Sequence, residues 1–170
     1  RYTCSELYDR VSRLCNGLKE IGVKEGEVVG VIDWDTYVYM ESYFAVPMSS
    51  ATLHTINIRY PPELIYLTMN YANDKYVIVR DEFVPILEKN ASLFDFVKGW
   101  IVYSDEGKPV ETKLSPKFEY EDIIKKGKCD PPDLDEDTRA TIFFTSGTTG
   151  MPKGVTFTQK QLVLHALSLS

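Results

Sequence analysis

The chain has 170 residues, a net charge of −6 and a hydrophobic share of 44%. A length of this order fits one globular domain. The negative charge argues against nucleic acid as the main partner, because phosphate backbones attract clustered lysine and arginine. No apolar run reaches the ~18 residues that a transmembrane helix needs. The three cysteines, Cys4, Cys15 and Cys129, match neither a disulfide framework nor a zinc spacing, which favours a reducing, cytoplasmic environment.

The first predicted element is an amphipathic helix. Thr3 and Glu6 have the spacing of a capping box, in which each side chain bonds a backbone N–H at the helix start. Gly22 provides a stop at the other end. Between them runs an apolar stripe with steps of three and four residues, formed by Leu7, Val11, Leu14, Leu18 and Ile21.

Short apolar runs and helical patterns then alternate along the chain. Thr36 is a candidate N-cap, and Pro47 is expected to end or kink its helix. Strands are predicted at 28–33, 51–57, 76–79, 100–103, 140–144 and 154–158, and helices at 36–48, 61–73, 83–91 and 159–170. The last two strands are expected to be buried. Repeated alternation predicts an α/β fold, a doubly wound, largely parallel sheet with helices on both faces.

Residues 105–138 differ from this pattern. They contain several glycines, prolines and charges, and only residues 119–126 have a helical pattern. We expect an irregular surface excursion with one helix, which joins the first strands to the last two.

The most unusual stretch is residues 145–154, TSGTTGMPKG, between the last two predicted strands. It consists largely of glycine, serine and threonine, with the single cation Lys153. Hydroxyls and backbone N–H groups freed by glycine form a concave anion site, and lysine adds a point charge suited to a polyphosphate. The composition favours a phosphate-binding loop over a hairpin turn without a ligand.

Two common nucleotide motifs do not fit this stretch. A P-loop has four residues between its glycines, followed by Lys and then Ser or Thr. Counting from Gly147, the second glycine is replaced by Pro152, and Gly154 follows the lysine. No Gly-x-Gly pair occurs here, which excludes the dinucleotide-binding fingerprint.

The stretch TSGTTGMPKGV instead resembles the phosphate-loop signature of the adenylate-forming enzymes: acyl-CoA synthetases, firefly luciferase and peptide-synthetase adenylation domains. The early segment YTCSELYDRVSRLCNGLKEIGVKEGEVVGV resembles the helix and strand that open this family's pattern. The segment AVPMSSATLHTINIRYPPELIYLTMNYANDK is similar to the version found in medium- and long-chain fatty acyl-CoA synthetases. The resemblance covers essentially the whole chain.

This resemblance implies that residues 1–170 are a fragment of the large N-terminal AMP-binding (adenylation) domain, with 105–138 as an excursion within it. The full enzyme would be an acid–thiol ligase that uses ATP, Mg²⁺ and coenzyme A. It would convert a fatty acid to an acyl-adenylate and pyrophosphate, and then to acyl-CoA. The adenine site, the acid pocket and a C-terminal domain with a catalytic lysine are expected beyond Ser170. The fragment alone is expected to be inactive, and no catalytic residue is assigned within it.

The resemblance also implies the site residues. The Thr145 hydroxyl is expected to face Mg²⁺, and Gly150 and Gly154 to serve the backbone turn. The residues implied to contact the ATP phosphates are Thr145, Ser146, Gly147, Thr148, Thr149, Gly150 and Lys153. One departure is visible, because Gln159 follows Thr158 where many members have histidine.

Other polar residues receive structural interpretations. For His54 and His165 we expect packed or surface roles, because no Ser, Cys or carboxylate is arranged near either in sequence. Asp33 and Asp35 flank Trp34 at the end of a strand and before a helix, which favours capping over acid–base or metal chemistry.

Two alternative functions remain open: a non-enzymatic phosphate-binding module, and a superfamily member that activates an aryl or amino acid. The apolar final helix also suggests that copies of the chain associate with one another.

Overall fold

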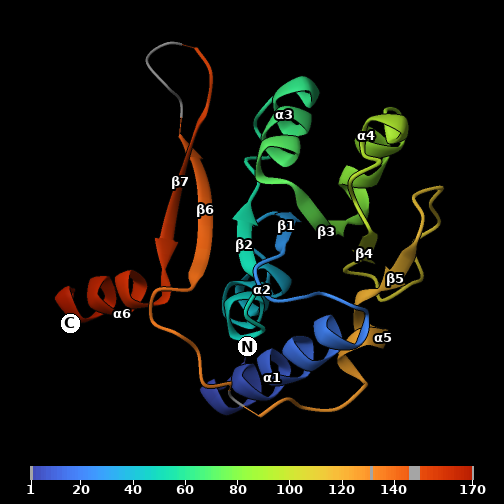
Figure 1. Ribbon diagram of the computed structural model, residues 1–170. Helices are drawn as coiled ribbons and strands as arrows, with labels where there is room; N and C mark the ends of the chain where they lie inside the picture. Colours follow the sequence, from blue (N-terminus) through green and yellow to red (C-terminus); the bar gives the residue numbers. More distant parts are fainter. Residues whose placement is uncertain (1, 131, 146–149, 170) are drawn as a thin grey trace.

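The computed structural model describes residues 2–130, 132–145 and 150–169, and these form a seven-stranded sheet with helices on both faces of its central strands (Figure 1). The strand order is β5-β4-β3-β1-β2-β6-β7. The strands are β1 (Val28–Ile32), β2 (Thr52–Thr55), β3 (Asp74–Arg80), β4 (Gly99–Tyr103), β5 (Lys117–Glu119), β6 (Arg139–Thr145) and β7 (Lys153–Thr158).

The strands from β5 through β6 pair in parallel, and β7 pairs antiparallel with β6. The short connection between β6 and β7 is compatible with an antiparallel pair, because parallel strands need a longer crossover. The prediction of a largely parallel sheet is confirmed.

The helices lie on both faces of the sheet, as expected for a doubly wound fold. One face packs against α1 (Cys4–Glu20), α2 (Tyr37–Met48) and α5 (Tyr120–Ile124). The other face packs against α3 (Pro62–Ala72) and α4 (Val84–Glu88), the latter flanked by the 3₁₀ turns η1 (Asp81–Phe83) and η2 (Ala91–Leu93). The remaining helix, α6 (Gln159–Ser168), follows β7 at the end of the chain.

The residues predicted to begin and end the first helices do so in the structure. At the start of α1, the Thr3 side chain accepts a hydrogen bond from the Glu6 backbone, and the Glu6 carboxylate accepts one from the Thr3 N–H at 2.7 Å. At the start of α2, the Thr36 hydroxyl accepts a hydrogen bond from the Tyr39 N–H. Gly22 has φ of +103°, a left-handed conformation that glycine adopts without strain.

The segment 105–138 is more ordered than predicted. The three-residue strand β5 extends the sheet beside β4, and α5 follows it directly. The helix predicted at 119–126 is therefore present but shorter. The sequence did not predict β5, because its three residues are exposed or half-buried and form no apolar run.

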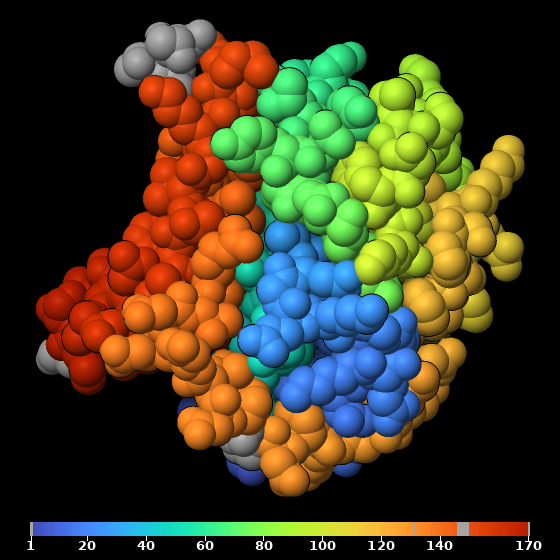
Figure 2. Space-filling view, in the orientation of Figure 1, coloured from blue at the N-terminus to red at the C-terminus, as the bar shows by residue number. Residues whose placement is uncertain are grey.

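The expectation that the last two strands are buried is wrong for β7. In β6, residues 140–142 are buried, whereas all of β7 is exposed except the half-buried Thr158. The reason is position: β7 lies at the outer edge of the sheet, and no described element covers either of its faces. Figure 2 shows β7 and α6 (red) as a projection at one side of the molecule.

Candidate functional site

The described ends of the candidate loop face each other across the β6–β7 ribbon. Thr145 is the last residue of β6, Lys153 is the first of β7, and the two are cross-strand partners. Both residues are exposed. Directly opposed residues on antiparallel strands have Cβ atoms ~5 Å apart on one face of the ribbon. A hydroxyl and a cation are therefore presented together at the point where the loop begins and ends.

Glycines shape the path of the chain at this tip. Gly150 has φ of +87°, which only glycine adopts without strain, and no atom of the described residues lies within 4 Å of the place a Cβ would occupy. Gly154 pairs with Phe144, and a Cβ at Gly154 would lie 3.3 Å from the Phe144 ring. The strand next to the loop thus packs its backbone against an aromatic side chain.

The four central positions of the predicted site, Ser146, Gly147, Thr148 and Thr149, lie outside the described residues. Their assignment to ATP phosphates stays a prediction, as do those of Thr145, Gly150 and Lys153. The described part is chemically suited to an anion: no ion pair engages Lys153 among residues 2–130, 132–145 and 150–169. A solvent-exposed ammonium without a carboxylate partner remains available to a phosphate.

The Thr145 hydroxyl is an available oxygen ligand for magnesium, because Thr145 is exposed at the end of β6. In the described ranges, no three His, Cys, Asp or Glu side chains come together as metal ligands. Mg²⁺ retains several waters and binds substrate phosphates in many enzymes, so a single protein hydroxyl is compatible with it. The described residues therefore fit Mg²⁺ only as a partner of bound phosphates.

Beneath Phe144 lies a buried pair that the sequence reasoning missed. The Nδ1 atom of His54 is 2.9 Å from Asp74 Oδ2, and the two side chains are 1% and 0% exposed. His54 is packed, as expected. Its carboxylate partner, Asp74, comes from another strand, and no residue near His54 in sequence indicated it. A signal existed in Gly30, which interrupts an all-apolar strand, since an isolated strand glycine often marks a close approach by other groups.

The two carboxylates after β1 have separate environments. Asp33 is buried and accepts hydrogen bonds from the Trp34 N–H at 2.7 Å and from the Thr36 hydroxyl. Burial raises the pKa of Asp33, and the bond from Thr36 opposes this rise. Asp35 is exposed. Asp33 therefore orients Thr36, which is the N-cap of α2, and the prediction that Asp33 or Asp35 itself caps the helix is wrong.

Gln159 and His165 belong to the start and the last turn of α6. The Gln159 side chain donates to the Pro47 carbonyl at 3.1 Å, which ties α6 to the end of α2. Thr158 and Gln161 form a capping box at the same helix start. His165 is exposed, consistent with a surface role.

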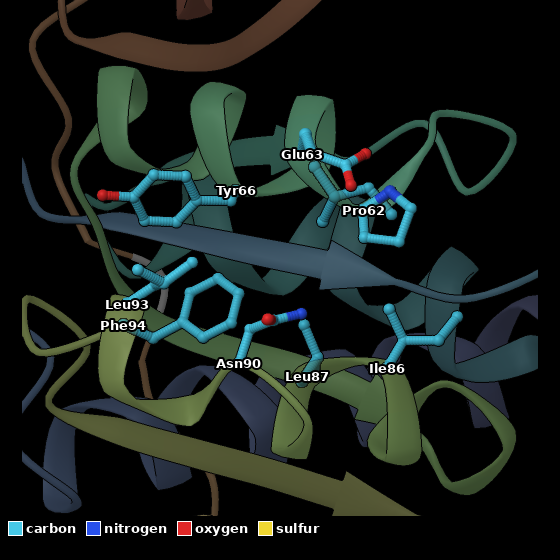
Figure 3. A pocket seen from close by; sticks show the side chains of 9 residues that line it. Pro62, Glu63, Tyr66, Ile86, Leu87, Asn90, Leu93 and Phe94 are labelled. Carbon is cyan, nitrogen blue, oxygen red and sulfur yellow. The ribbon is translucent and has the colours of Figure 1, made fainter.

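A separate groove lies between α3 and α4 (Figure 3). Its volume is about 120 Å³, below the ~300 Å³ at which pockets for organic ligands begin. Tyr66 of α3 faces Leu93 and Phe94 across it. No described residue of the candidate loop lines this groove, so the groove is separate from the described part of the loop site. It is also too small for a fatty acyl chain. Among the described helices, none combines the length and hydropathy required to cross a membrane.

Comparison with known proteins supplies the remaining findings. A family model described as "AMP-binding enzyme" matches residues 1–170. A long-chain-fatty-acid–CoA ligase from Thermus thermophilus is 35% identical over 100% of this chain and 30% of its own length. A medium-chain-fatty-acid–CoA ligase from Ectopseudomonas oleovorans is 31% identical over 96% of this chain and 30% of its own length. The chain thus spans about a third of the curated relatives it matches.

Solved structures share the fold. An anthranilate CoA ligase in complex with anthranoyl-AMP superposes with a TM-score of 0.86 at 22% identity, covering 96% of this chain and 31% of that one. The ATP-bound form of MatB from Rhodopseudomonas palustris gives a TM-score of 0.80 at 20% identity, covering 97% of this chain and 31% of that one.

Proposed function

We propose, because the chain belongs to the AMP-binding enzymes over its whole length, that it forms part of the AMP-binding domain of a fatty acyl-CoA ligase. In the proposed reaction, a carboxylate oxygen of the fatty acid attacks the α-phosphorus of ATP, and the bond to pyrophosphate breaks. The thiol of coenzyme A then attacks the acyl carbon, and AMP leaves. The observation that carries this proposal is the match to relatives named as fatty-acid–CoA ligases, over 170 residues for the long-chain ligase and 165 residues for the medium-chain ligase.

The fatty acid is favoured over an aryl acid by the degree of similarity. The two fatty-acid ligases are 35% and 31% identical to this chain, whereas a ligase named for trans-cinnamate, an aryl acid, is 28% identical, so similarity favours the fatty acid by a small margin. A non-enzymatic module is disfavoured, because the similarity includes the strands and helices around the loop as well as the loop itself.

In this proposal the loop binds the β- and γ-phosphates of ATP. Thr145 and Lys153 present a hydroxyl and an ammonium from neighbouring strands, and the hydroxyls of Ser146, Thr148 and Thr149 are proposed as further donors to the phosphates. The N–H of Gly147 and the turn at Gly150 allow the backbone to approach the phosphates closely. Donors already in place stabilise the charge that grows on the departing pyrophosphate. Bound Mg²⁺ would neutralise phosphate charge, with the Thr145 hydroxyl as one of its oxygen ligands.

Turnover is proposed to need the remaining two thirds of the ligase. The α3–α4 groove is too small for the acyl chain, and the hollow of about 350 Å³ on the other side of α4 is lined mostly by charged and polar residues. The acid pocket is therefore assigned to the rest of the enzyme, as are the adenine site and the coenzyme A site. Adenylation requires the carboxylate and the α-phosphate to be held together, and most of the rate comes from that positioning. The 170-residue chain by itself is therefore proposed to be inactive.

We also propose a cellular compartment and protein contacts for the chain. Cys4, Cys15 and Cys129 are free thiols, which supports a reducing cytoplasm. Exposed apolar side chains on β7, on α6 and at the C-cap of α6 support contact with further protein, either the rest of the ligase or a second copy; they are Val155, Phe157, Val163, Leu164 and Leu169.

The role of the loop is tested with Lys153→Ala in the complete ligase. Loss of one cation near the leaving pyrophosphate removes a charged hydrogen bond of about 1.5–3 kcal/mol, so ATP–pyrophosphate exchange should slow roughly ten- to a hundredfold. The matched control is Lys160→Ala, which removes an equally charged residue that pairs with Glu136. Equal exchange rates in the two variants would contradict the assigned role.

A further inference from the structure

The buried pair of His54 and Asp74 spans three strands below the candidate loop. His54 lies on β2 and Asp74 at the start of β3, with β1 between them. The register of β1 and β3 shifts between Val28 and Val29, and such an irregularity re-aims nearby side chains. Gly30 leaves room for the contact, since a Cβ at this position would lie 2.8 Å from Asp74 Oδ2.

Burial of the His54–Asp74 pair costs free energy, which indicates that the His54 ring has a role beyond filling space. Asp74 is fully buried, and burial raises its pKa while the contact with His54 opposes the rise. The other ring nitrogen, Nε2, is buried and finds no hydrogen-bond partner in the described part of the chain. An apolar pair of the same shape would avoid both penalties.

The ring of His54 contacts the residue that leads into the loop. Its centroid is 5.0 Å from that of Phe144, which directly precedes Thr145. Phe144 also meets Tyr71 of α3 edge-on, at 5.8 Å and 87°. On the neighbouring strand Phe144 pairs with Gly154, the residue after Lys153. A continuous series of contacts therefore runs from Asp74 through His54 and Phe144 to both ends of the loop.

We propose that His54 is a positioning residue for the phosphate-binding loop, and that Asp74 orients its ring. The imidazole holds Phe144 in place, and Phe144 holds Thr145 and Lys153 opposite each other. This inference rests on the proposed function of the loop in binding ATP. It assigns no contact between His54 and the substrate.

The test replaces both members of the pair, His54→Leu with Asp74→Leu, in the complete ligase. Leucine has the same branching as aspartate and leaves no buried polar group, so the double variant should fold with a melting temperature at or above that of the wild type. A flexible aliphatic side chain no longer fixes the Phe144 ring. The KM for ATP should rise roughly 3- to 30-fold, the range for residues that couple to a site without touching it. The KM for the fatty acid should stay constant.

The matched control is Val102→Ala, on the same face of the sheet but on β4. It should lower the melting temperature and leave the KM for ATP unchanged. An unchanged KM for ATP in the double variant would overturn the positioning role.

A second measurement does not depend on activity. In the wild-type and double-variant chains, amide hydrogen exchange should differ at residues 143–145 and 153–155 and should agree along β4 (Gly99–Tyr103). Equal exchange at the loop ends would also overturn the inference. If the wild-type ligase exchanges no pyrophosphate with any acid, the proposed function fails, and hydrogen exchange still decides whether the pair holds Phe144.

Discussion

Glu41 is a fully buried carboxylate whose removal should destabilise the fold strongly. It lies on α2, where its Oε1 is 2.5 Å from Arg10 Nε of α1 and its Oε2 accepts a hydrogen bond from the Tyr120 hydroxyl at 2.7 Å. The side chain of Glu41 and the whole of Tyr120 are 0% exposed. Burial, together with the charge of Glu41, raises the pKa of Tyr120 well above its usual range, so the phenol stays protonated and donates. One carboxylate thus joins α1, α2 and α5.

The magnitude follows from what Glu41→Ala leaves behind. Removal of one partner from a buried ion pair costs about 3–5 kcal/mol. Arg10 is partly exposed and keeps Glu121 at 2.9 Å, which places its share at the lower end of that range. The buried Tyr120 hydroxyl loses its partner, a loss of about 1–3 kcal/mol when the group stays desolvated. Because these contributions overlap, we expect Glu41→Ala to lower the free energy of unfolding by about 3–4 kcal/mol.

The assay is urea unfolding at pH 7, with comparison of midpoints at constant slope. Glu41→Gln retains an acceptor for Tyr120 but no charge for Arg10, so its loss should lie between those of Glu41→Ala and the control. The control is Glu121→Ala, which removes the exposed partner of the same arginine and should cost under ~1 kcal/mol. A loss for Glu41→Ala no larger than that of the control would refute the reasoning.

Three further predictions concern other sites. Gly17→Ala, a change that would add ~1 kcal/mol of stability in a free helix, should instead destabilise by about 1–3 kcal/mol, because the new Cβ would lie 2.4 Å from the Ile123 carbonyl oxygen; a gain in the urea midpoint would contradict this packing. In thiol labelling at pH 8, exposed Cys4 should react in the native state while Cys15 should not, since burial raises the pKa of Cys15 to about 12; equal labelling rates would argue against the buried position. Burial raises the pKa of Asp33 in the folded state. The Asp33 side chain therefore contributes most to the free energy of unfolding below its unfolded pKa of ~4, and this contribution is lost as the pH rises through the folded pKa. The unfolding free energy of the wild type minus that of Asp33→Asn should therefore fall between pH 3 and 7, and a rise would contradict the sign.

Local signals predicted most of the secondary structure. The Thr3 and Glu6 capping box, the left-handed Gly22 and the apolar run at β1 are each determined by residues within a few positions of one another. The strand β5 was missed because Lys117–Glu119 is short and polar, and only its pairing with β4 makes it a strand. Burial of β7 was predicted wrongly because hydrophobicity is local, whereas burial depends on which elements lie beside the strand.

The candidate site was predictable in part for the same reason. The loop and its lysine are contiguous in sequence, so their composition alone indicated phosphate. The support beneath the loop was not predictable, because His54, Asp74 and Phe144 come from three strands that only the folded sheet brings together. The contact between Gln159 and Pro47 likewise depends on where α6 meets α2.

ATP–pyrophosphate exchange with a panel of carboxylic acids tests the central claim most directly. The complete ligase that carries this chain should catalyse exchange with medium- or long-chain fatty acids, and more slowly or not at all with benzoate, anthranilate and amino acids. The 170-residue chain alone should catalyse none. Exchange by the complete protein with aryl or amino acids only would contradict the assignment as a fatty acyl-CoA ligase, and robust exchange by the 170-residue chain would contradict the proposed division of the active site.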